Sequence, residues 1–214
     1  MAEKLDTQTR REQIAEAALE LIGRTGVRGL SLAAVARRVG LVPSAIYRHF
    51  KGREEVLDAV IDLVPRRLQA NVAAVLGETE SSLERLERLA GRHVRLIQEN
   101  QVIPRLLFSE EVHLERPHRR AAVWEALRGY TGGIADIVRE GQSRGEIRPE
   151  LDPGTVSILF LGLVQPAAVF WLLSDGKFDA TEHLAKAWEI FRAAVEREPR
   201  APAKGRRKRV REPS

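Results

Sequence analysis

Apolar residues recur at intervals of three and four along most of this chain, which is the spacing of an amphipathic helix. No convincing run alternates apolar and polar residues as a half-buried strand does, and proline or glycine stands near many of the breaks between runs. The pattern predicts helices at about 9–23, 31–39, 43–50, 53–76, 82–98, 102–114, 117–143, 153–173 and 180–197. The chain is therefore expected to be all-α, and no internal repeat is found in it.

The stretch from residue 30 to residue 51 predicts two short helices joined by a turn. Ser31 suits the cap of the first helix, because its hydroxyl can accept from the free N–H groups of the first turn. Gly40 suits the point where that helix stops, since glycine readily takes a positive φ. Pro43 suits the first position of the second helix, which Ile46 would anchor to the first. This arrangement is typical of a helix-turn-helix, so it indicates DNA binding.

The charge of this region supports contact with DNA. Between Glu20 and Glu54 the chain has seven basic side chains and no Asp or Glu; the seven are Arg24, Arg28, Arg37, Arg38, Arg48, Lys51 and Arg53. A nearby carboxylate would oppose the release of counterions from neutralised phosphates, so an acid-free surface favours phosphate binding. The alternative is a solvated basic face on an ordinary helical hairpin.

A further helix is expected upstream of this pair. The spacing of Thr9 and Glu12 is that of a capping box, which would start a helix running to about Gly23. The apolar residues of this helix form one stripe, which would pack across the pair and complete a three-helix unit: Ile14, Ala17, Ala18, Leu21 and Ile22. Residues 1–8 are expected to form a short frayed arm, and no apolar targeting segment follows Met1.

These residues resemble the DNA-binding domain of the TetR family of bacterial transcriptional regulators. The resemblance covers residues 9 to about 60, about a quarter of the chain, and is carried by Thr9-Arg10, Ile14, Ala17-Ala18, Leu21-Ile22, Gly26, Ser31-Leu32, Val35-Ala36, Gly40-Leu41 and Ile46-Tyr47-Arg48-His49-Phe50-Lys51. It implies an N-terminal three-helix helix-turn-helix domain at 9–52. A six-helix effector-binding and dimerisation domain would follow at 53–198, with a basic tail at 199–214.

The resemblance also implies which side chains contact DNA. Phosphate contacts would come from Ser31, Tyr47, His49 and Lys51, base-edge contacts from Ser44, Ala45 and Arg48, and Thr9 and Arg10 complete the predicted DNA-binding set. The sequence departs from the family at Val42, where a Ser or Thr usually caps the recognition helix. Ala45 cannot form a hydrogen bond to a base, so direct readout is expected to be sparse.

Length, charge and cysteine content narrow the interpretation. The 214 residues leave some 140 for a second core after the DNA-binding unit. Residues 200–214 hold seven basic side chains and one Glu, so they contribute +6 to a net charge of +5 and the rest of the chain sums to −1. The tail is predicted to be disordered, and either grips DNA non-specifically or has no role. The absence of Cys excludes disulfides and fits a cytoplasmic protein.

The helix predicted at 153–173 contains 19 successive residues without a charge. Such a helix is buried on all sides or spans a membrane. Polar or helix-weakening residues within it argue against the membrane: Ser157, Gly162, Gln165 and Pro166. In the TetR family the last two long helices form a four-helix dimer contact, and here these would be 153–173 and 180–197. Dimerisation would place two recognition helices in major grooves about 34 Å apart.

The resemblance further implies a repressor that a small effector releases from a pseudo-palindromic operator. The candidate effector-binding residues are Leu63, His93, Ile97, Phe108, Trp124, Leu127, Tyr130, Phe170 and Trp171. Their aliphatic and aromatic character favours a lipophilic effector, with His93 and Tyr130 as polar anchors. Each of them also fits an ordinary core position.

Two Glu-x-x-His spacings suggest another class of function. They are Glu110 to His113 and Glu115 to His118, and one metal site from Glu110, Glu111, His113 and His118 would make a metal-responsive regulator or a helical metalloprotein. The alternative is surface charge at a helix end. A glycine-rich phosphate loop, a nucleophile elbow and an HExxH motif are all missing from the sequence. No enzyme activity, catalytic residue or cofactor is therefore predicted.

Overall fold

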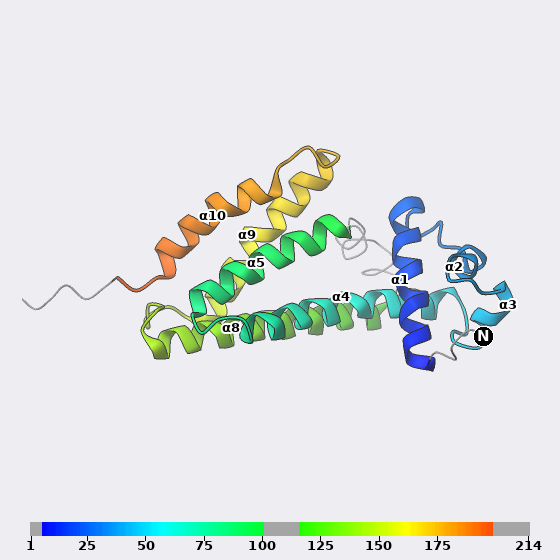
Figure 1. Cartoon of the computed structure of the whole chain (residues 1–214), viewed down its shortest axis with the longest axis horizontal. Helices are drawn as coiled ribbons and strands as arrows, with labels where there is room; N and C mark the ends of the chain where they lie inside the picture. The colour runs from blue at the N-terminus through cyan, green and yellow to red at the C-terminus, as the bar shows by residue number, and fades with distance from the viewer. Residues whose placement is uncertain (1–5, 101–115, 199–214) are drawn as a thin grey trace, which may run out of the picture.

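A computed structural model describes residues 6–100 and 116–198, and within these ranges the chain is all-α. The helices are α1 (Thr7–Thr25), α2 (Leu32–Arg38), α3 (Pro43–Ile46), α4 (Arg53–Leu76), α5 (Ser82–Glu99), α8 (Pro117–Arg144), α9 (Pro153–Leu173) and α10 (Ala180–Val195). Figure 1 shows α1, α2 and α3 gathered at one end, with α4 and α8 running side by side along the molecule. We call the α1–α3 unit the head. The predicted helix at 102–114 lies outside the described residues.

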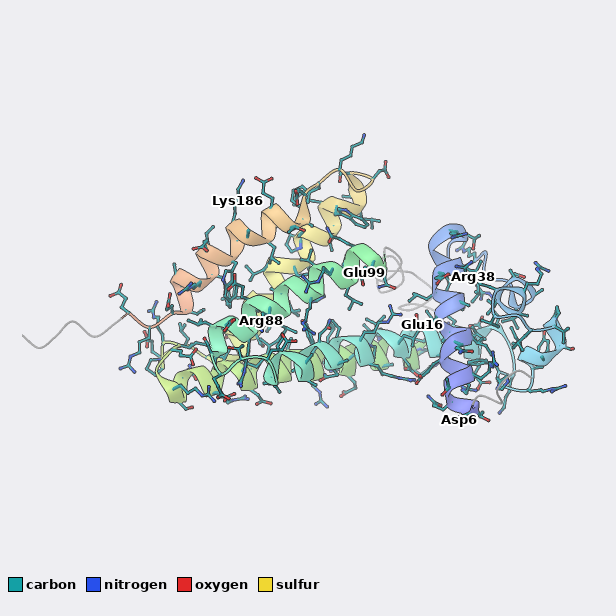
Figure 2. All side chains as sticks on the ribbon, viewed as in Figure 1. Asp6, Glu16, Arg38, Arg88, Glu99 and Lys186 are labelled. Atoms are coloured by element: carbon teal, nitrogen blue, oxygen red, sulfur yellow. The ribbon has the colours of Figure 1, made fainter. Side chains whose placement is uncertain are left out.

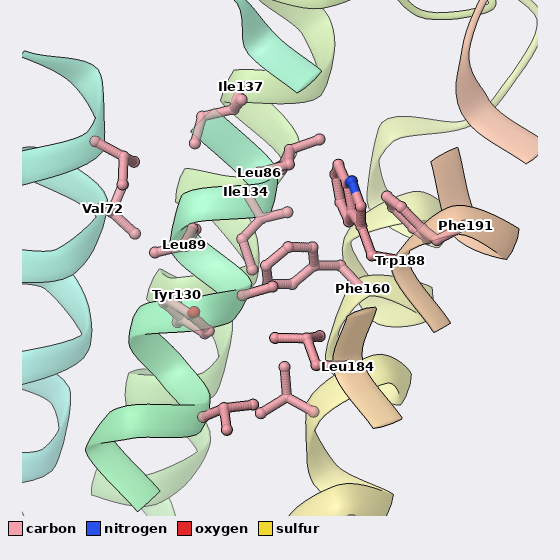
Figure 3. Packing of buried hydrophobic residues seen from close by; sticks show 14 of the residues in the cluster. Val72, Leu86, Leu89, Tyr130, Ile134, Ile137, Phe160, Leu184, Trp188 and Phe191 are labelled. Carbon is pink, nitrogen blue, oxygen red and sulfur yellow. The ribbon is translucent and has the colours of Figure 1, made fainter. Parts of the chain in front are cut away.

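Two hydrophobic cores form this structure. The head core combines apolar side chains of α1, α2 and α3 with the first half of α4 and with Val123 of α8. The second core lies among the rest of α4, α5, α8, α9 and α10. Figure 3 shows side chains from these five helices meeting in that core, among them Val72, Leu89 and Phe160. Leu63 belongs to the head core and Val64 to the second core, so the boundary crosses α4 beside Pro65.

Local chemistry sets several helix ends as expected. The Ser31 hydroxyl accepts from the Ala34 N–H at 3.4 Å and caps α2. Gly40 then turns the chain with φ +69°, a conformation that favours glycine. Asp152 caps α9 by accepting from the Thr155 N–H at 2.6 Å. The expected boundaries of α4 and α9 are confirmed at both ends.

The start of α1 differs from the capping-box prediction. Thr9 lies within the helix, which begins at Thr7, so the predicted cap is wrong and two residues of the expected arm are helical. Asp6 occupies the N-cap position without a side-chain cap, and its carbonyl accepts from the Arg10 N–H at 3.0 Å. These first residues are exposed, so water can satisfy the free N–H groups and no side-chain cap is required. The other end also extends, from Gly23 to Thr25.

The recognition helix is shorter than predicted. α3 ends at Ile46, and the next residues continue as turns in which the His49 N–H donates to the Ile46 carbonyl at 2.9 Å. Such three-residue bonds tighten a chain as it leaves a helix. α10 ends at Val195 rather than 197, because the chain there becomes extended and Arg197 donates its N–H to the Glu146 carbonyl at 2.9 Å.

Candidate nucleic-acid interface

The segment from α3 to the start of α4 presents polar side chains on an anchored backbone. Ile46 and Phe50 are buried in the head core, which fixes both ends of the turn between them. Tyr47 is 62 % exposed, and Arg48 and Lys51 are also exposed. Of the other predicted DNA contacts, Thr9, Ser31 and Ser44 are exposed, whereas Arg10, Ala45 and His49 are half-buried. The predicted residues therefore lie at the end of the molecule that carries the head, and each is at least partly exposed.

The basic residues of the acid-free window are not all available to phosphate. Arg38 is paired with Glu20 across α1 and α2. Arg53 pairs with Glu54 at 2.9 Å and donates to the Val27 carbonyl. Arg37 and Arg48 are exposed, and among the described acidic residues none lies within ion-pair distance of either. The absence of acidic residues in the sequence therefore overstates the positive charge of this surface.

Arg11 is a positioning residue that the motif analysis missed. It donates to the His49 carbonyl and, with both terminal nitrogens, to Glu55 Oε1 at 3.0 Å. The guanidinium carbon lies 4.1 Å from the centre of the Phe50 ring. Arg11 therefore ties α1 to the segment that carries Tyr47 and Arg48. Its partners are 38 and 44 residues away, so no local signal marks the contact.

Glu55 holds the other side of the same segment. Its Oε2 accepts from the Lys51 N–H at 2.7 Å, at the point where α4 begins. That backbone hydrogen bond, together with the charge of Arg11, brings the pKa of the Glu55 carboxyl below its ordinary value despite partial desolvation. Glu55 is therefore a stable anion that connects α1 and α4 with residues 46–51, which we call the reading segment.

The cap at the start of α3 is absent, as the sequence predicted. Val42 is the N-cap residue, is 65 % exposed, and offers no side-chain acceptor to the first turn. His49 also has an unsatisfied polar atom. Its Nδ1 is buried and has no hydrogen-bond partner among the described residues. Both features belong to the segment predicted to face DNA.

Two of the candidate effector-binding residues form a polar pair inside the second core. The Tyr130 hydroxyl and His93 Nδ1 are 3.2 Å apart, and the rings pack edge to face with centroids 5.3 Å apart. Burial lowers the pKa of His93 to about 4 and raises the pKa of Tyr130. Ile97 is buried in the same core, and Trp171 packs against it.

The remaining effector candidates lie elsewhere. Leu63 is buried in the head core, and Leu127 packs against that core. Trp124 and Phe170 are exposed, on α8 and α9 respectively. An apolar cavity between α4 and α8, which Leu127 helps to line, measures about 30 Å³, roughly the volume of one water molecule in the liquid. Phe108 lies outside the described residues. The candidate residues are thus divided among the two cores and the surface. Helical spacing predicts that a residue is buried, but it does not predict in which core.

Comparison with known proteins decides the family. A model described as "Bacterial regulatory proteins, tetR family" matches residues 14–60, and "Tetracyclin repressor-like, C-terminal domain" matches residues 79–195, more than half of the chain. The chain belongs to the TetR family. It is therefore a TetR-family transcriptional regulator of the DNA-binding helix-turn-helix type.

Individual relatives are distant but extend over most of the chain. A fatty acid metabolism regulator protein of Bacillus subtilis is 25 % identical over 78 % of this chain and 86 % of its own length. The nucleoid occlusion factor SlmA of Aliivibrio fischeri is 21 % identical over 87 % of this chain and 96 % of its own. A TetR-family regulator from Rhodococcus has a solved structure with a TM-score of 0.71, 25 % identity, and coverage of 86 % of this chain and 97 % of its own.

In this TetR-family chain the charge-free helix α9 buries one face and exposes the other. Its buried side includes Phe160, Val164 and Ala167, which join the second core. Its exposed side is a stripe at helical spacing, Ile158, Leu159, Gly162, Gln165, Pro166, Val169, Phe170 and Leu173, which we call the α9 stripe. Among the described helices, α9 is long and apolar enough to cross a membrane, with a mean hydropathy of 2.1, by length and composition only.

The metal hypothesis gains no support from the described residues. Within 6–100 and 116–198, no group of three or more His, Asp or Glu side chains is placed to hold a metal ion. His118 Nε2 lies 3.4 Å from Asp58 Oδ1, an oxygen that Arg119 also contacts, so Asp58 is the one described carboxylate beside this histidine. Glu110, Glu111, His113 and Glu115 lie outside the described residues.

Proposed function

We propose that this TetR-family regulator is a repressor that binds a pseudo-palindromic operator as a homodimer and is released by a small lipophilic effector. The observation that carries the DNA-binding part is the anchored reading segment, in which exposed Tyr47, Arg48 and Lys51 alternate with buried Ile46 and Phe50. Side chains on a fixed backbone can reach a groove without a large ordering cost. The proposed domains are residues 9–52, which include most of the head, and residues 53–198.

The side chains of the segment suit different parts of the duplex. The Tyr47 hydroxyl is a neutral donor to phosphate, and Lys51 brings a point charge near the start of α4. Arg48 is exposed and has no described acidic partner, so its five donors are available for a guanine edge or a phosphate. Ser31, Ser44, Ala45 and His49, with Thr9 and Arg10, complete the proposed contact surface.

The α9 stripe supports the proposed dimer. It is an apolar face that a soluble monomer would leave in water, where contiguous patches of this kind usually mark an interaction site. Gly162 lies in the middle of the stripe, and a Cβ built there would meet nothing within 4 Å, so another helix can approach closely. Ile190 exposes a further large apolar side chain on the neighbouring α10. A second copy of the same two helices would cover this surface.

The effector proposal rests on the composition of the second core. His93 and Tyr130 are a hydrogen-bonded polar pair beside the buried aliphatic and aromatic side chains of the second core, and both are neutral at physiological pH. A lipophilic molecule with few polar groups would suit such surroundings. Among structures of the same fold, a FadR regulator from Bacillus subtilis is in complex with stearoyl-CoA; it is 22 % identical, with a TM-score of 0.70.

Titration of duplex DNA with the purified chain at several salt concentrations tests the function. The probe is a duplex recovered by genomic footprinting, with a random duplex as reference. We expect Lys51→Ala to weaken binding to both duplexes and to reduce the slope of log affinity against log salt by about one. Tyr47→Ala should weaken binding without that change in slope.

The control is Lys177→Ala, which removes an exposed lysine in the turn between α9 and α10, outside the head. Its affinity and salt slope should equal those of the unaltered protein. An unaltered protein that forms no complex at low salt would refute DNA binding, and an unchanged slope in Lys51→Ala would refute the phosphate contact. A cytoplasmic location follows from the proposal, and residues 199–214 would add non-specific affinity if they contact DNA.

A further inference from the structure

A buried arginine at the start of α8 binds the first turns of α4. Arg119 is 2 % exposed, and its Nε donates to Asp58 Oδ1 at 2.6 Å. Its Nη2 donates to Glu54 Oε2 at 2.9 Å and to the Glu54 carbonyl at 3.1 Å. One guanidinium thus holds two carboxylates and a main-chain oxygen in fixed directions, which a lysine ammonium cannot reproduce.

The same turn of α4 also holds the reading segment. Glu54 faces Arg119, and the next residue, Glu55, accepts from the Lys51 N–H and from Arg11. Arg11 in turn donates to the His49 carbonyl. A continuous series of charge-assisted contacts therefore runs from α8, through one turn of α4, to the backbone on both sides of Phe50.

The electrostatics favour a permanently charged cluster. Burial alone would raise the pKa of the Glu54 carboxyl, but hydrogen bonds and charge from Arg119 and then Arg53 bring it below its ordinary value. Val123, one turn beyond Arg119 on α8, is buried in the head core. The first turns of α8 are thus attached to the start of α4 by charge and to the head core by apolar packing.

We propose that Arg119 is a positioning residue for DNA binding, which fixes the orientation of the reading segment relative to the effector domain through Glu54 and Asp58. This inference rests on the proposed function. Because α8 also carries Tyr130 in the second core, a displacement of α8 would reach the reading segment through this contact. The structural alternative is that Arg119 contributes only to folding.

The variant Arg119→Lys separates the two roles. It keeps the charge but loses the three-way geometry. Glu54 and Asp58 have side chains that are 43 % and 39 % exposed, so water can solvate the carboxylates that lose a partner and the chain should fold. The matched control is Arg85→Lys. Arg85 is 5 % exposed and binds Glu140 and the Thr79 and Leu76 carbonyls, at the opposite end of α4 from the head.

The first measurement compares affinities for the footprinted duplex at fixed salt, with thermal unfolding followed in parallel. We expect Arg119→Lys to lower affinity on the order of tenfold, a typical coupling between distant sites, while Arg85→Lys leaves it unchanged at a similar loss of thermal stability. In combination with Arg11→Lys, the effect of Arg119→Lys on affinity should be less than multiplicative, since both act through one turn of α4.

The second measurement reads the orientation of the head directly. The chain has no Cys, so spin labels at Arg24→Cys on α1 and Glu87→Cys on α5 are unique. Diluted with unlabelled protein, they report the distance between head and effector domain within one chain. We expect Arg119→Lys to shift or broaden this distance distribution, and Arg85→Lys to leave it unchanged.

Each outcome bears on a different proposal. If the unaltered protein does not bind the duplex, the proposed function fails. If it binds, and Arg119→Lys matches Arg85→Lys in both affinity and distance, Arg119 has only a structural role and the positioning inference is overturned.

Discussion

His93 and Tyr130 place a polar contact where almost every neighbouring side chain is apolar. A buried imidazole has no solvent to stabilise its charge, so the folded chain keeps His93 neutral well below the pH at which the unfolded chain protonates it. Tyr130 satisfies Nδ1 by a hydrogen bond of 3.2 Å. The pair therefore links protonation to folding as well as offering the second core a hydrogen-bonding group.

This linkage predicts a pH-dependent stability. The pKa of His93 is about 4 in the folded chain against 6.5 in the unfolded one, so its contribution is complete above 6.5 and is lost as the pH falls towards 4. Between pH 7 and pH 5 the loss should be about 2 kcal/mol of unfolding free energy. Urea unfolding at the two pH values measures it.

Two variants identify the group responsible. His93→Phe should show a smaller fall in unfolding free energy between pH 7 and pH 5 than the unaltered protein. Tyr130→Phe, which retains the histidine, should keep most of that fall. Equal pH dependence in the unaltered protein and His93→Phe would show that other groups cause the effect.

Residue roles could be predicted from the sequence where the partner is close along the chain. Ser31 and Gly40 act within one helical turn, so their chemistry is visible in four or five letters. Arg11 and Arg119 act on partners 38 to 65 residues away, and nothing local distinguishes them from solvated arginines. Position in space, rather than residue type, makes them part of the interface.

Among the elements, α3 is one of four described helices, with α1, α4 and α8, that begin without a side-chain cap. It has four residues and begins at Pro43, so proline fixes the first φ while Val42 leaves the N–H groups of the first turn without a side-chain acceptor. The extended backbone of Val42, φ −70° and ψ 145°, is already that of an N-cap residue. The missing cap is a matter of side chain and not of backbone.

Restoring a cap should therefore stabilise the head. We expect Val42→Ser to raise the unfolding free energy above that of Val42→Ala by about 1 kcal/mol, the usual value of an N-cap hydroxyl. Val42→Ala is the control because it removes the same exposed apolar side chain without adding an acceptor. Urea unfolding compares the two, and equal stabilities would mean that the first turn of α3 gains nothing from a cap.

For the helices, the sequence pattern predicts some boundaries, whereas tertiary packing determines others. The boundaries of α4 and α9 were predictable because Arg53 follows a glycine and Asp152-Pro153 is a strong start signal. The short α3 was not, because its last turn depends on how Ile46 and Phe50 pack. For the apolar helix α9, only the fold shows which face is exposed.

At the scale of the whole molecule, the α9 stripe predicts the oligomeric state. Val169 and Phe170 are 42 % and 55 % exposed in one chain, so a charge at either position costs little in a monomer, where Phe170 gives up its contact with the Phe178 ring. The same charge would be buried in the proposed dimer. We expect Val169→Glu and Phe170→Glu to be folded monomers by light scattering, with much weaker DNA binding. Loss of helix content in both would point instead to a role in the core.

The control for this test is Leu76→Glu, which places the same charge on an exposed apolar residue in the last turn of α4. It should remain a dimer. A dimer that persists in both α9 variants would move the interface elsewhere, and detergent-dependent recovery of the unaltered protein would favour the membrane interpretation of α9. These two outcomes can be told apart, because a dimer with its interface elsewhere remains soluble without detergent.

Ion pairs also join the head directly to α4. Glu12 and Glu16 of α1 bind Arg66 and Arg67 of α4, and Arg67 also donates to the Asn100 side chain at the end of α5. Figure 2 shows Glu16 on the side of α1 that is nearest to α5. The head is thus attached mainly through α4, and Val123 of α8 adds apolar packing in the head core.

α4 is continuous as a helix but divided in its packing, and Pro65 lies at the division. Proline has no N–H, so the carbonyl of Ile61, four residues earlier, lacks its usual helical donor. Bending this rod by a few degrees at that place breaks no existing bond, whereas bending it elsewhere would. A rotation of the head core against the second core would therefore have its preferred pivot at Pro65.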